Sequence, residues 1–210
     1  MIDISAHSIY GWTEAVRGMR NSWNSWANSD SNIDILGERD LKLMNSLALA
    51  GPSHAKYRRM ITVYIDISAP IYWWKEFDTY KVGTVTNSTS TMHTVTKKPF
   101  DISDFSCEKL DGNSETFFAH VVRHLNHLRD RYSNETDPDK KKDLWYQIVQ
   151  LLPESYNQKR TVMLNYEVLA NIYNDRKYHK LDEWREFCAF IETLPYADGL
   201  IFQGDQTTDD

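Results

Sequence analysis

The feature that most constrains the fold is the segment ITVYIDISAPIYWWKEF, residues 61–77. Apolar side chains at positions 63, 65 and 67 alternate with polar ones, which predicts a β-strand with one buried face. The Ala-Pro pair at 69–70 ends this strand, and Pro70 suits the first turn of a helix, which IYWWKEF continues. Because a strand leads directly into an aromatic helix, we expect a fold in which helices pack on a sheet.

Helical periodicity recurs over most of the remaining chain, with apolar residues spaced three and four apart. Ser114 is the expected N-cap of a long helix, and Asp137-Pro138 opens the next one. The expected helices cover residues 13–28, 38–50, a segment from 114 onward, 138–152, 159–175 and 181–193. We therefore predict an α+β fold, in which several packed helices surround a small antiparallel sheet.

The length and composition favour a single domain. The chain has 210 residues, of which 41% are apolar, so one sizeable core is expected over residues 1–204. Residues 205–210 form a polar, acidic tail that we expect to be disordered. Seven Trp and twelve Tyr residues favour broad interfaces or pockets for flat ligands.

The charge excludes one class of partner. The formal net charge is −6, whereas a general nucleic-acid binder needs a concentrated basic face. A single nucleotide held by a few local cations remains compatible with this charge.

The cysteines and the first residues indicate the compartment. Cys107 and Cys188 are far apart in sequence, which disfavours a secreted disulfide scaffold and a cysteine-rich zinc module. The start MIDISAHSIYGW has neither the basic nor the apolar region of a signal peptide. No run approaches the ~18 apolar residues that a membrane span needs. We expect a soluble, cytoplasmic protein.

The stretch EFDTYKVGTVTNSTSTMHT, residues 76–94, is unusually rich in Ser and Thr. It directly follows the aromatic segment that contains two tryptophans. Two interpretations remain open from the residues alone: an ordinary polar loop, or the lining of a pocket for a polar ligand.

Motifs for metal or phosphate binding are weak. His120, His124 and His127 share one helical stripe and could bind a transition metal, but a fourth ligand is not evident. A solvated or subunit-facing stripe is the favoured interpretation, and we predict no metal site. The chain has neither a glycine-rich phosphate loop nor a G-x-S-x-G elbow.

The segment NYEVLANIYNDR, residues 165–176, carries polar side chains in a mostly apolar helix. Asn165, Asn171 and Arg176 could hold the polar edge of a base or of an isoalloxazine ring, because burying them without partners is costly. Ordinary surface or capping use is the favoured alternative.

Taken together, these segments resemble the flavin-dependent thymidylate synthase (ThyX) family over roughly residues 13–195. The likeness lies in a helix that leads to a histidine, an alternating strand with an aromatic run, the Ser/Thr-rich stretch, a Leu-Pro segment and a closing Trp element. In this sequence they are LKLMNSLALAGPSH (41–54), ITVYIDISAPIYWW (61–74), residues 76–94, LLPESYNQKRTVMLNYEVLANIYNDR (151–176) and EWREF (183–187).

The resemblance implies a homotetramer with shared active sites. Each site would hold FAD and dUMP, take a methylene from methylenetetrahydrofolate and take a hydride from NADPH. The residues that would bind the flavin cofactor are His54, Asn87, Asn165 and Asn171.

The resemblance also implies nucleotide contacts. Ser90 and His93 would be polar, catalytic contacts near the pyrimidine, and Ser88 would join Ser90 in binding the substrate. Lys81 and Arg176 would clamp the phosphate as cations.

The sequence departs from the family pattern in its cations. The Arg-His-Arg triplet is replaced by residues 79–81 or 80–82, depending on register, and the following Arg-Tyr pair by Met92 and His93. Glu167 stands where the family has Arg. A guanidinium fork binds phosphate through planar donors that Met or Thr lack.

These departures favour a second hypothesis beside the enzyme. Lys81, Arg58, Arg59 and Arg176 could supply a different phosphate site. Alternatively, the chain is a non-catalytic relative that binds a nucleotide or a host protein. The stretch WWKEFDTYKVGTV is similar to sequences in prophages of Gram-positive bacteria, which implies a phage protein in the cytoplasm of an infected cell.

Overall fold

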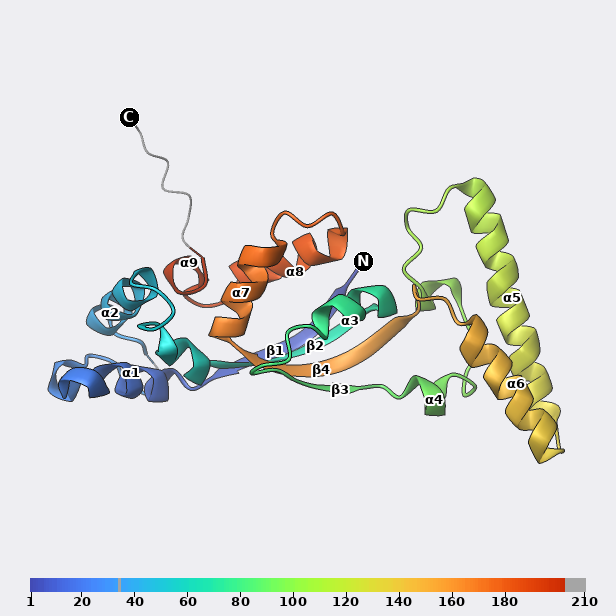
Figure 1. The fold of residues 1–210 in the computed structure, drawn as a ribbon, viewed down its shortest axis with the longest axis horizontal. Helices are drawn as coiled ribbons and strands as arrows, with labels where there is room; N and C mark the ends of the chain where they lie inside the picture. Colours follow the sequence, from blue (N-terminus) through green and yellow to red (C-terminus); the bar gives the residue numbers. More distant parts are fainter. Residues whose placement is uncertain (34, 203–210) are drawn as a thin grey trace. The chain divides into compact units, whose positions relative to one another are not determined.

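A computed structural model describes residues 1–33 and 35–202. It confirms the expected α+β class, with a four-stranded antiparallel sheet and packed helices. Figure 1 shows the strand order β1-β2-β4-β3, so that β4 lies between β2 and β3 although it comes last in the sequence. The strands are β1 (Asp3–Tyr10), β2 (Thr62–Pro70), β3 (Val85–Ser88) and β4 (Asn157–Asn165).

The described residues contain nine α-helices and four short 3-10 segments. Of the predicted helices, those that begin at Glu38, Ile71, Pro138 and Asp182 are confirmed. The helices are α1 (Trp12–Arg20), α2 (Glu38–Leu49), α3 (Ile71–Phe77), α4 (Thr91–Thr94), α5 (Gly112–Asn134), α6 (Pro138–Leu151), α7 (Tyr166–Arg176), α8 (Asp182–Glu192) and α9 (Ala197–Leu200). The 3-10 segments are Asn21–Trp23, Trp26–Asn28, Lys56–Met60 and Ile102–Asp104.

Strand β2 and helix α3 form as the sequence predicts. Val63, Ile65 and Ile67 are buried, and the residues between them are more exposed. Trp73 and Trp74 on α3 are fully buried. Strand β1 was not predicted, because its short sequence DISAHSIY lacks a strict alternation of apolar residues.

The helix predicted for residues 159–175 is wrong in its first part, where β4 forms instead. Val162 and Leu164 are fully buried and alternate with more exposed residues, which is the period of a strand. Asn165 then begins the helix, since its side-chain oxygen accepts a hydrogen bond from the Val168 backbone N–H at 3.1 Å.

The helix predicted for residues 13–28 also proved too long. Helix α1 ends at Arg20, and Asn24 adopts a left-handed conformation with φ 50°, which a continuous helix does not allow. As a result Trp23 and Trp26 do not continue the buried face, and they are 87% and 51% exposed.

The predicted N-cap of α5 is displaced by three residues. Asp111, rather than Ser114, caps this helix, because its carboxylate accepts a hydrogen bond from the Ser114 backbone N–H at 2.9 Å. An aspartate at this position also interacts favourably with the helix dipole.

The described chain divides into two compact units, which we call unit 1 and unit 2. Unit 1 comprises residues 1–3, 67–77 and 87–160, and unit 2 comprises residues 4–66, 78–86 and the described residues from 161 onward. Strands β2 and β4 each continue from one unit into the other. The boundary of a single domain at residue 204 remains a prediction.

Unit 1 has a core built on α5 and α6, which lie side by side in Figure 1. Apolar residues of both helices meet three residues from the segment between α4 and α5. The buried residues of this core are Val95, Phe100, Phe105, Val122, Leu125, Leu128, Leu144 and Ile148.

Unit 2 contains a buried ion pair between α1 and α2. Arg20 Nε donates to Asp40 Oδ1 at 2.6 Å, and the two side chains are 6% and 0% exposed. Ser29 and Ser31 donate hydroxyl hydrogen bonds to the other Asp40 oxygen, each at 2.7 Å. These contacts fix the segment that joins the two helices.

Three further predictions concern the ends, the cysteines and the membrane. The tail predicted at residues 205–210 lies outside the described residues. Cys107 and Cys188 are both free thiols. Across residues 1–33 and 35–202, helices long and apolar enough to span a bilayer are absent.

Candidate functional site

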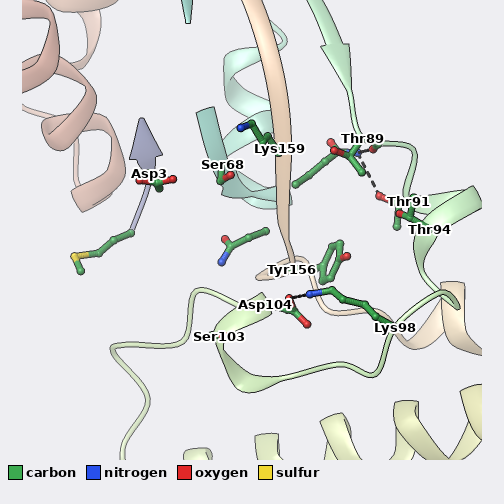
Figure 2. Close-up of a pocket in the computed structure, with 13 residues that line it drawn as sticks. Asp3, Ser68, Thr89, Thr91, Thr94, Lys98, Ser103, Asp104, Tyr156 and Lys159 are labelled. Atoms are coloured by element: carbon green, nitrogen blue, oxygen red, sulfur yellow. Dashed lines mark hydrogen bonds and ion pairs between the residues drawn. The ribbon is translucent and has the colours of Figure 1, made fainter. Parts of the chain in front are cut away.

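A polar cavity with a volume of about 420 Å³ lies in unit 1. Residues at the start of β1, near the end of β2 and at the start of β4 form one side. The Ser/Thr-rich segment and the loop around the 3-10 segment Ile102–Asp104 form the rest, as Figure 2 shows. The lining residues are Met1, Asp3, Ser68, Thr89, Thr91, Thr94, Lys98, Ser103, Asp104, Tyr156, Asn157, Gln158 and Lys159.

Gln158 connects β4 to the Ser/Thr-rich segment. Its side-chain nitrogen donates to the Thr89 carbonyl at 2.9 Å and to Thr91 Oγ1 at 3.2 Å. The Thr89 backbone N–H donates to the Lys159 carbonyl at 2.9 Å. This wall of the pocket is therefore fixed by side-chain and backbone bonds together.

A second wall is held by an ion pair. Lys98 Nζ donates to Asp104 Oδ1 at 2.6 Å, beside the Tyr156 ring in Figure 2. The other Asp104 oxygen accepts from the Asp101 backbone N–H at 2.9 Å, which closes a capping box. The hydrogen bond to Asp104 raises the pKa of Lys98 above its usual value, so Lys98 stays charged at neutral pH.

Tyr156 presents its hydroxyl from an aromatic cluster. Its ring contacts Phe105 and Phe100 edge to face, with centroids 5.6 and 6.2 Å apart. Burial raises the pKa of Tyr156, and the charge of Asp104 adds to this effect. The hydroxyl is therefore protonated at neutral pH and can donate a hydrogen bond.

The structure places the predicted residues of unit 1 next to the pocket lining rather than in it. Asn87 and Ser88 are exposed on β3, and Ser90 and His93 are exposed at α4. The lining positions on this segment are 89, 91 and 94 instead. Sequence reasoning found the segment, but the side-chain direction along it could not be read from hydroxyl content alone.

Arg176 in unit 2 is held by two aromatic residues. Its Nε donates to the Tyr80 hydroxyl at 2.9 Å, and its guanidinium carbon lies 4.7 Å from the centroid of the buried Trp184 ring. The Tyr80 hydroxyl donates to Asp175 Oδ2 at 3.2 Å. The structure thus joins the start of the Ser/Thr-rich stretch to the end of α7, a contact that sequence reasoning missed.

The other site residues predicted in unit 2 are His54, Lys81, Asn171 and Asn165. His54, Lys81 and Asn171 are exposed. The Asn165 amide nitrogen lies 2.9 Å from the position that a Cβ on Gly83 would occupy, and Gly83 has φ +80°. A larger residue at 83 would therefore collide with Asn165 and would strain the backbone.

Arg58 and Glu167 form a nearly buried, loosely matched pair in unit 2. Arg58 Nη1 lies 3.9 Å from Glu167 Oε2, and both side chains are 13% exposed. The Arg58 Nε and Glu167 Oε2 atoms are buried and lack a hydrogen-bond partner among the described residues. Glu167 thus neutralises Arg58, a cation that the sequence analysis offered for phosphate binding.

The histidine stripe lies exposed on α5. The rings of His124 and His127 are 6.4 Å apart between centroids, and His120 Nδ1 lies 3.5 Å from Arg123 Nη1. A group of three or more side chains able to hold a metal ion is absent from residues 1–33 and 35–202.

Comparison with known proteins yields matches among solved structures. Neither the models of known protein families nor the curated proteins match the chain. The crystal structure of flavin-dependent thymidylate synthase ThyX from Helicobacter pylori, complexed with FAD and dUMP, is similar with a TM-score of 0.68 at 18% identity. It covers 96% of this chain and 97% of that one.

Two further structures have the same fold. Another ThyX structure from Helicobacter pylori, with FAD and dUMP, gives a TM-score of 0.68 at 17% identity, with 96% of each chain covered. The UMP/dUMP methylase PolB from Streptomyces cacaoi, bound with 5-Br dUMP, gives 0.58 at 12% identity, covering 92% of this chain and 88% of that one. The chain therefore has the ThyX fold.

Proposed function

We propose that this protein is a divergent relative of the flavin-dependent thymidylate synthases that binds FAD and a pyrimidine deoxynucleotide such as dUMP. The observation that carries the proposal is the fold match over 96% of the chain to a protein crystallised with both ligands. The polar pocket in unit 1 supports it, because the Ser/Thr-rich segment lines a cavity of ligand size.

The reaction proposed is methylation of the pyrimidine. Methylenetetrahydrofolate would supply the carbon and NADPH the hydride, and FAD when bound would supply the redox chemistry. The chain's own residues would bind and orient the ligands, with Lys81 and Arg176 contacting the phosphate and Ser88, Ser90 and His93 near the pyrimidine.

Three of the four residues proposed to bind the flavin have side chains that are accessible to a ligand. His54 and Asn171 are exposed, and Asn87 lies exposed on β3, so a ligand can reach all three side chains. Asn165 is different, because its oxygen caps α7 and its amide nitrogen packs beneath Gly83. Its role in this proposal is to position the start of α7.

The direct test is to identify ligands that are carried by the purified protein. We expect flavin absorbance near one FAD per chain after reconstitution, and release of FAD and nucleotide on denaturation, detected by mass spectrometry. A heat-denatured sample serves as the control. Protein that shows no spectral change with added FAD and dUMP would contradict the proposal.

A non-catalytic relative of phage origin is the second candidate, and the Arg58–Glu167 pair favours it. That pair neutralises the guanidinium of Arg58, one of the cations considered for phosphate binding. Rescue of a thymidine-requiring host separates the two candidates, since only the enzyme restores growth.

We further propose a homotetramer in the cytoplasm. The chain mass is 24.6 kDa, and light scattering should return four times this value.

A further inference from the structure

Unit 1 contains a second cavity, the apolar pocket, which has a volume of about 440 Å³. It lies between the 3-10 segment Ile102–Asp104, the turn that follows, and the first half of α5. The apolar residues that line it are Ile102, Leu110, Phe118, Ala119 and Val122. The polar pocket shares no lining residue with it, so the two cavities can bind different ligands.

Two polar side chains complete the lining of the apolar pocket, the Cys107 thiol and the Glu115 carboxylate. Among residues 1–33 and 35–202, the Glu115 carboxylate has neither a hydrogen-bond partner nor an ion-pair partner. The neighbouring Glu108, by contrast, binds the Met1 ammonium at 2.7 Å. Small-molecule sites are mostly apolar cavities of roughly 300–1,000 Å³ with a few polar groups that orient the ligand, and this pocket has both properties.

The charges around the apolar pocket favour a cation. Burial raises the pKa of the Cys107 thiol, and the charges of Glu108 and Glu115 raise it further. The Met1 ammonium opposes this effect, but less strongly than either carboxylate. The potential at the thiol is therefore negative, and the protonated thiol acts as a further apolar part of the lining.

The one nearby feature that would attract an anion is already occupied. The first turn of α5 presents backbone N–H groups, which favour negative charge. The Asp111 carboxylate accepts a hydrogen bond from the Ser114 N–H there at 2.9 Å. An anionic ligand would meet Asp111 and Glu115 without a cation in the described lining to compensate for them.

We infer that the apolar pocket binds a small amphiphilic amine, a ligand with an apolar body and one primary ammonium group. The body lies against the Phe118 ring and the side chains of Leu110 and Val122. The ammonium donates to the Glu115 carboxylate, which is exposed at the rim of the pocket. This site goes beyond the proposed function, because FAD and dUMP are both anions.

Contacts within unit 1 hold the walls of the apolar pocket, which reduces the entropy lost on binding. The Phe118 ring meets the buried Phe105 ring edge to face, with centroids 5.2 Å apart. The Leu110 backbone N–H donates to the Cys107 carbonyl at 3.1 Å, which closes the turn. The apolar surface is therefore formed before a ligand arrives.

The experiment is a ligand-detected NMR titration of the full chain with phenylbutylamine, whose terminal amine is charged at neutral pH. A ligand of this size should bind with a dissociation constant on the order of 0.1–1 mM. Phenylbutanol and phenylbutyrate have the same apolar body with a neutral or an anionic end group. We expect the alcohol to bind about fivefold more weakly than the amine, because the charged contact is partly screened by water. The acid should show no saturable binding.

Ala119→Leu tests whether the probe occupies this pocket. It adds a larger side chain at an exposed lining position, and leucine is a good helix former, so α5 should be preserved. Phenylbutylamine binding should weaken by at least about tenfold, because the added side chain takes the space of the ligand. His127→Leu is the matched control, since it adds the same side chain at an exposed position of α5 outside the lining, and it should leave the affinity unchanged.

Glu115→Gln tests the role of the charge. It keeps the shape of the side chain, so the affinity for the amine should fall about fivefold while that for the alcohol is unchanged. The two probes should then bind alike. Asp143→Asn removes a carboxylate at an exposed position of α6 in the same unit and should change neither affinity.

Four results would overturn the inference: no saturable binding of the amine, unchanged amine affinity in Ala119→Leu, a preference for the amine that persists in Glu115→Gln, or binding of phenylbutyrate as tight as that of the amine. Thermal unfolding midpoints that match the wild-type protein show that each variant is folded. Should Ala119→Leu fail to fold, Glu115→Gln and the three probes still decide. Binding of FAD and dUMP is measured separately, so the inference and the proposed function can fail independently.

Discussion

The two polar regions of this chain use their hydrogen-bonding groups in opposite ways. In unit 2, Arg176 is held by the Tyr80 hydroxyl and the Trp184 ring, and Arg20 is buried against Asp40. In unit 1, the pocket leaves groups such as the Asp3 carboxylate and the Tyr156 hydroxyl open to a ligand. Groups that are paired within the chain should contribute to stability, and groups that face a cavity should contribute to binding.

The largest expected effect is on the buried pair of unit 2. Asp40→Ala leaves Arg20 as an uncompensated buried charge, so we expect the free energy of unfolding to fall by about 3–5 kcal/mol. Urea denaturation followed by circular dichroism measures it. Asp143→Ala, at an exposed position of α6, is the control and should change the free energy of unfolding by less than ~0.5 kcal/mol. A loss below ~1 kcal/mol for Asp40→Ala would show that the pair does not stabilise the unit.

Acid should weaken the same pair. Burial alone would raise the pKa of Asp40, but hydrogen bonds from Ser29, Ser31 and Arg20 outweigh it and lower the pKa to about 2. A lowered folded-state pKa gives stability that is present above the usual value of 3.8 and is lost as the pH falls through about 2. The loss should amount to roughly 2–2.5 kcal/mol. Asp40→Ala should show correspondingly less of this acid dependence between pH 5 and 2.

A smaller effect is expected at the arginine of α7. Tyr80→Phe keeps the ring but removes the hydroxyl that accepts from Arg176 and donates to Asp175. We expect the free energy of unfolding to fall by about 1 kcal/mol. Tyr178→Phe, at a tyrosine that is 83% exposed, is the control. Equal stability of the two variants would mean that the Tyr80 hydroxyl contributes nothing to the fold.

The smallest effect on stability is expected in the pocket. Tyr156→Phe removes a hydroxyl without a partner in the described chain, and it preserves the ring contacts with Phe100 and Phe105. The free energy of unfolding should therefore change by less than ~0.5 kcal/mol. A destabilisation as large as that of Tyr80→Phe would erase the contrast between the two regions.

The sequence predicted the secondary structure correctly where one hydrophobic periodicity was clear. Residues 61–77 alternate strictly and then turn at Ala-Pro, so β2 and α3 form where expected. The helix predicted from residue 159 wrongly included most of β4, because the alternation there is short and a true helix follows directly at Tyr166. Local pattern does not show that β4 inserts between β2 and β3, since that pairing joins residues far apart in the chain.

The candidate site was predictable only as a segment. The richness in Ser and Thr pointed to residues 76–94, and three threonines from this stretch line the pocket. Asp3, Ser68 and Tyr156 come from distant elements without a shared motif. Only the arrangement of β1, β2 and the start of β4 brings them together, so sequence spacing could not reveal them.

The fluorescence of Trp74 should respond to changes in the polar pocket, because its indole is hydrogen-bonded to a residue that lines it. Its Nε1 donates to the Gln158 carbonyl at 2.9 Å, while the Gln158 side chain holds the Thr89 carbonyl. The Arg160 guanidinium also lies 4.3 Å from the Trp74 ring centroid. A ligand that shifts this part of β4 should therefore change the emission of Trp74, so that the protein reports occupancy of its pocket without a label.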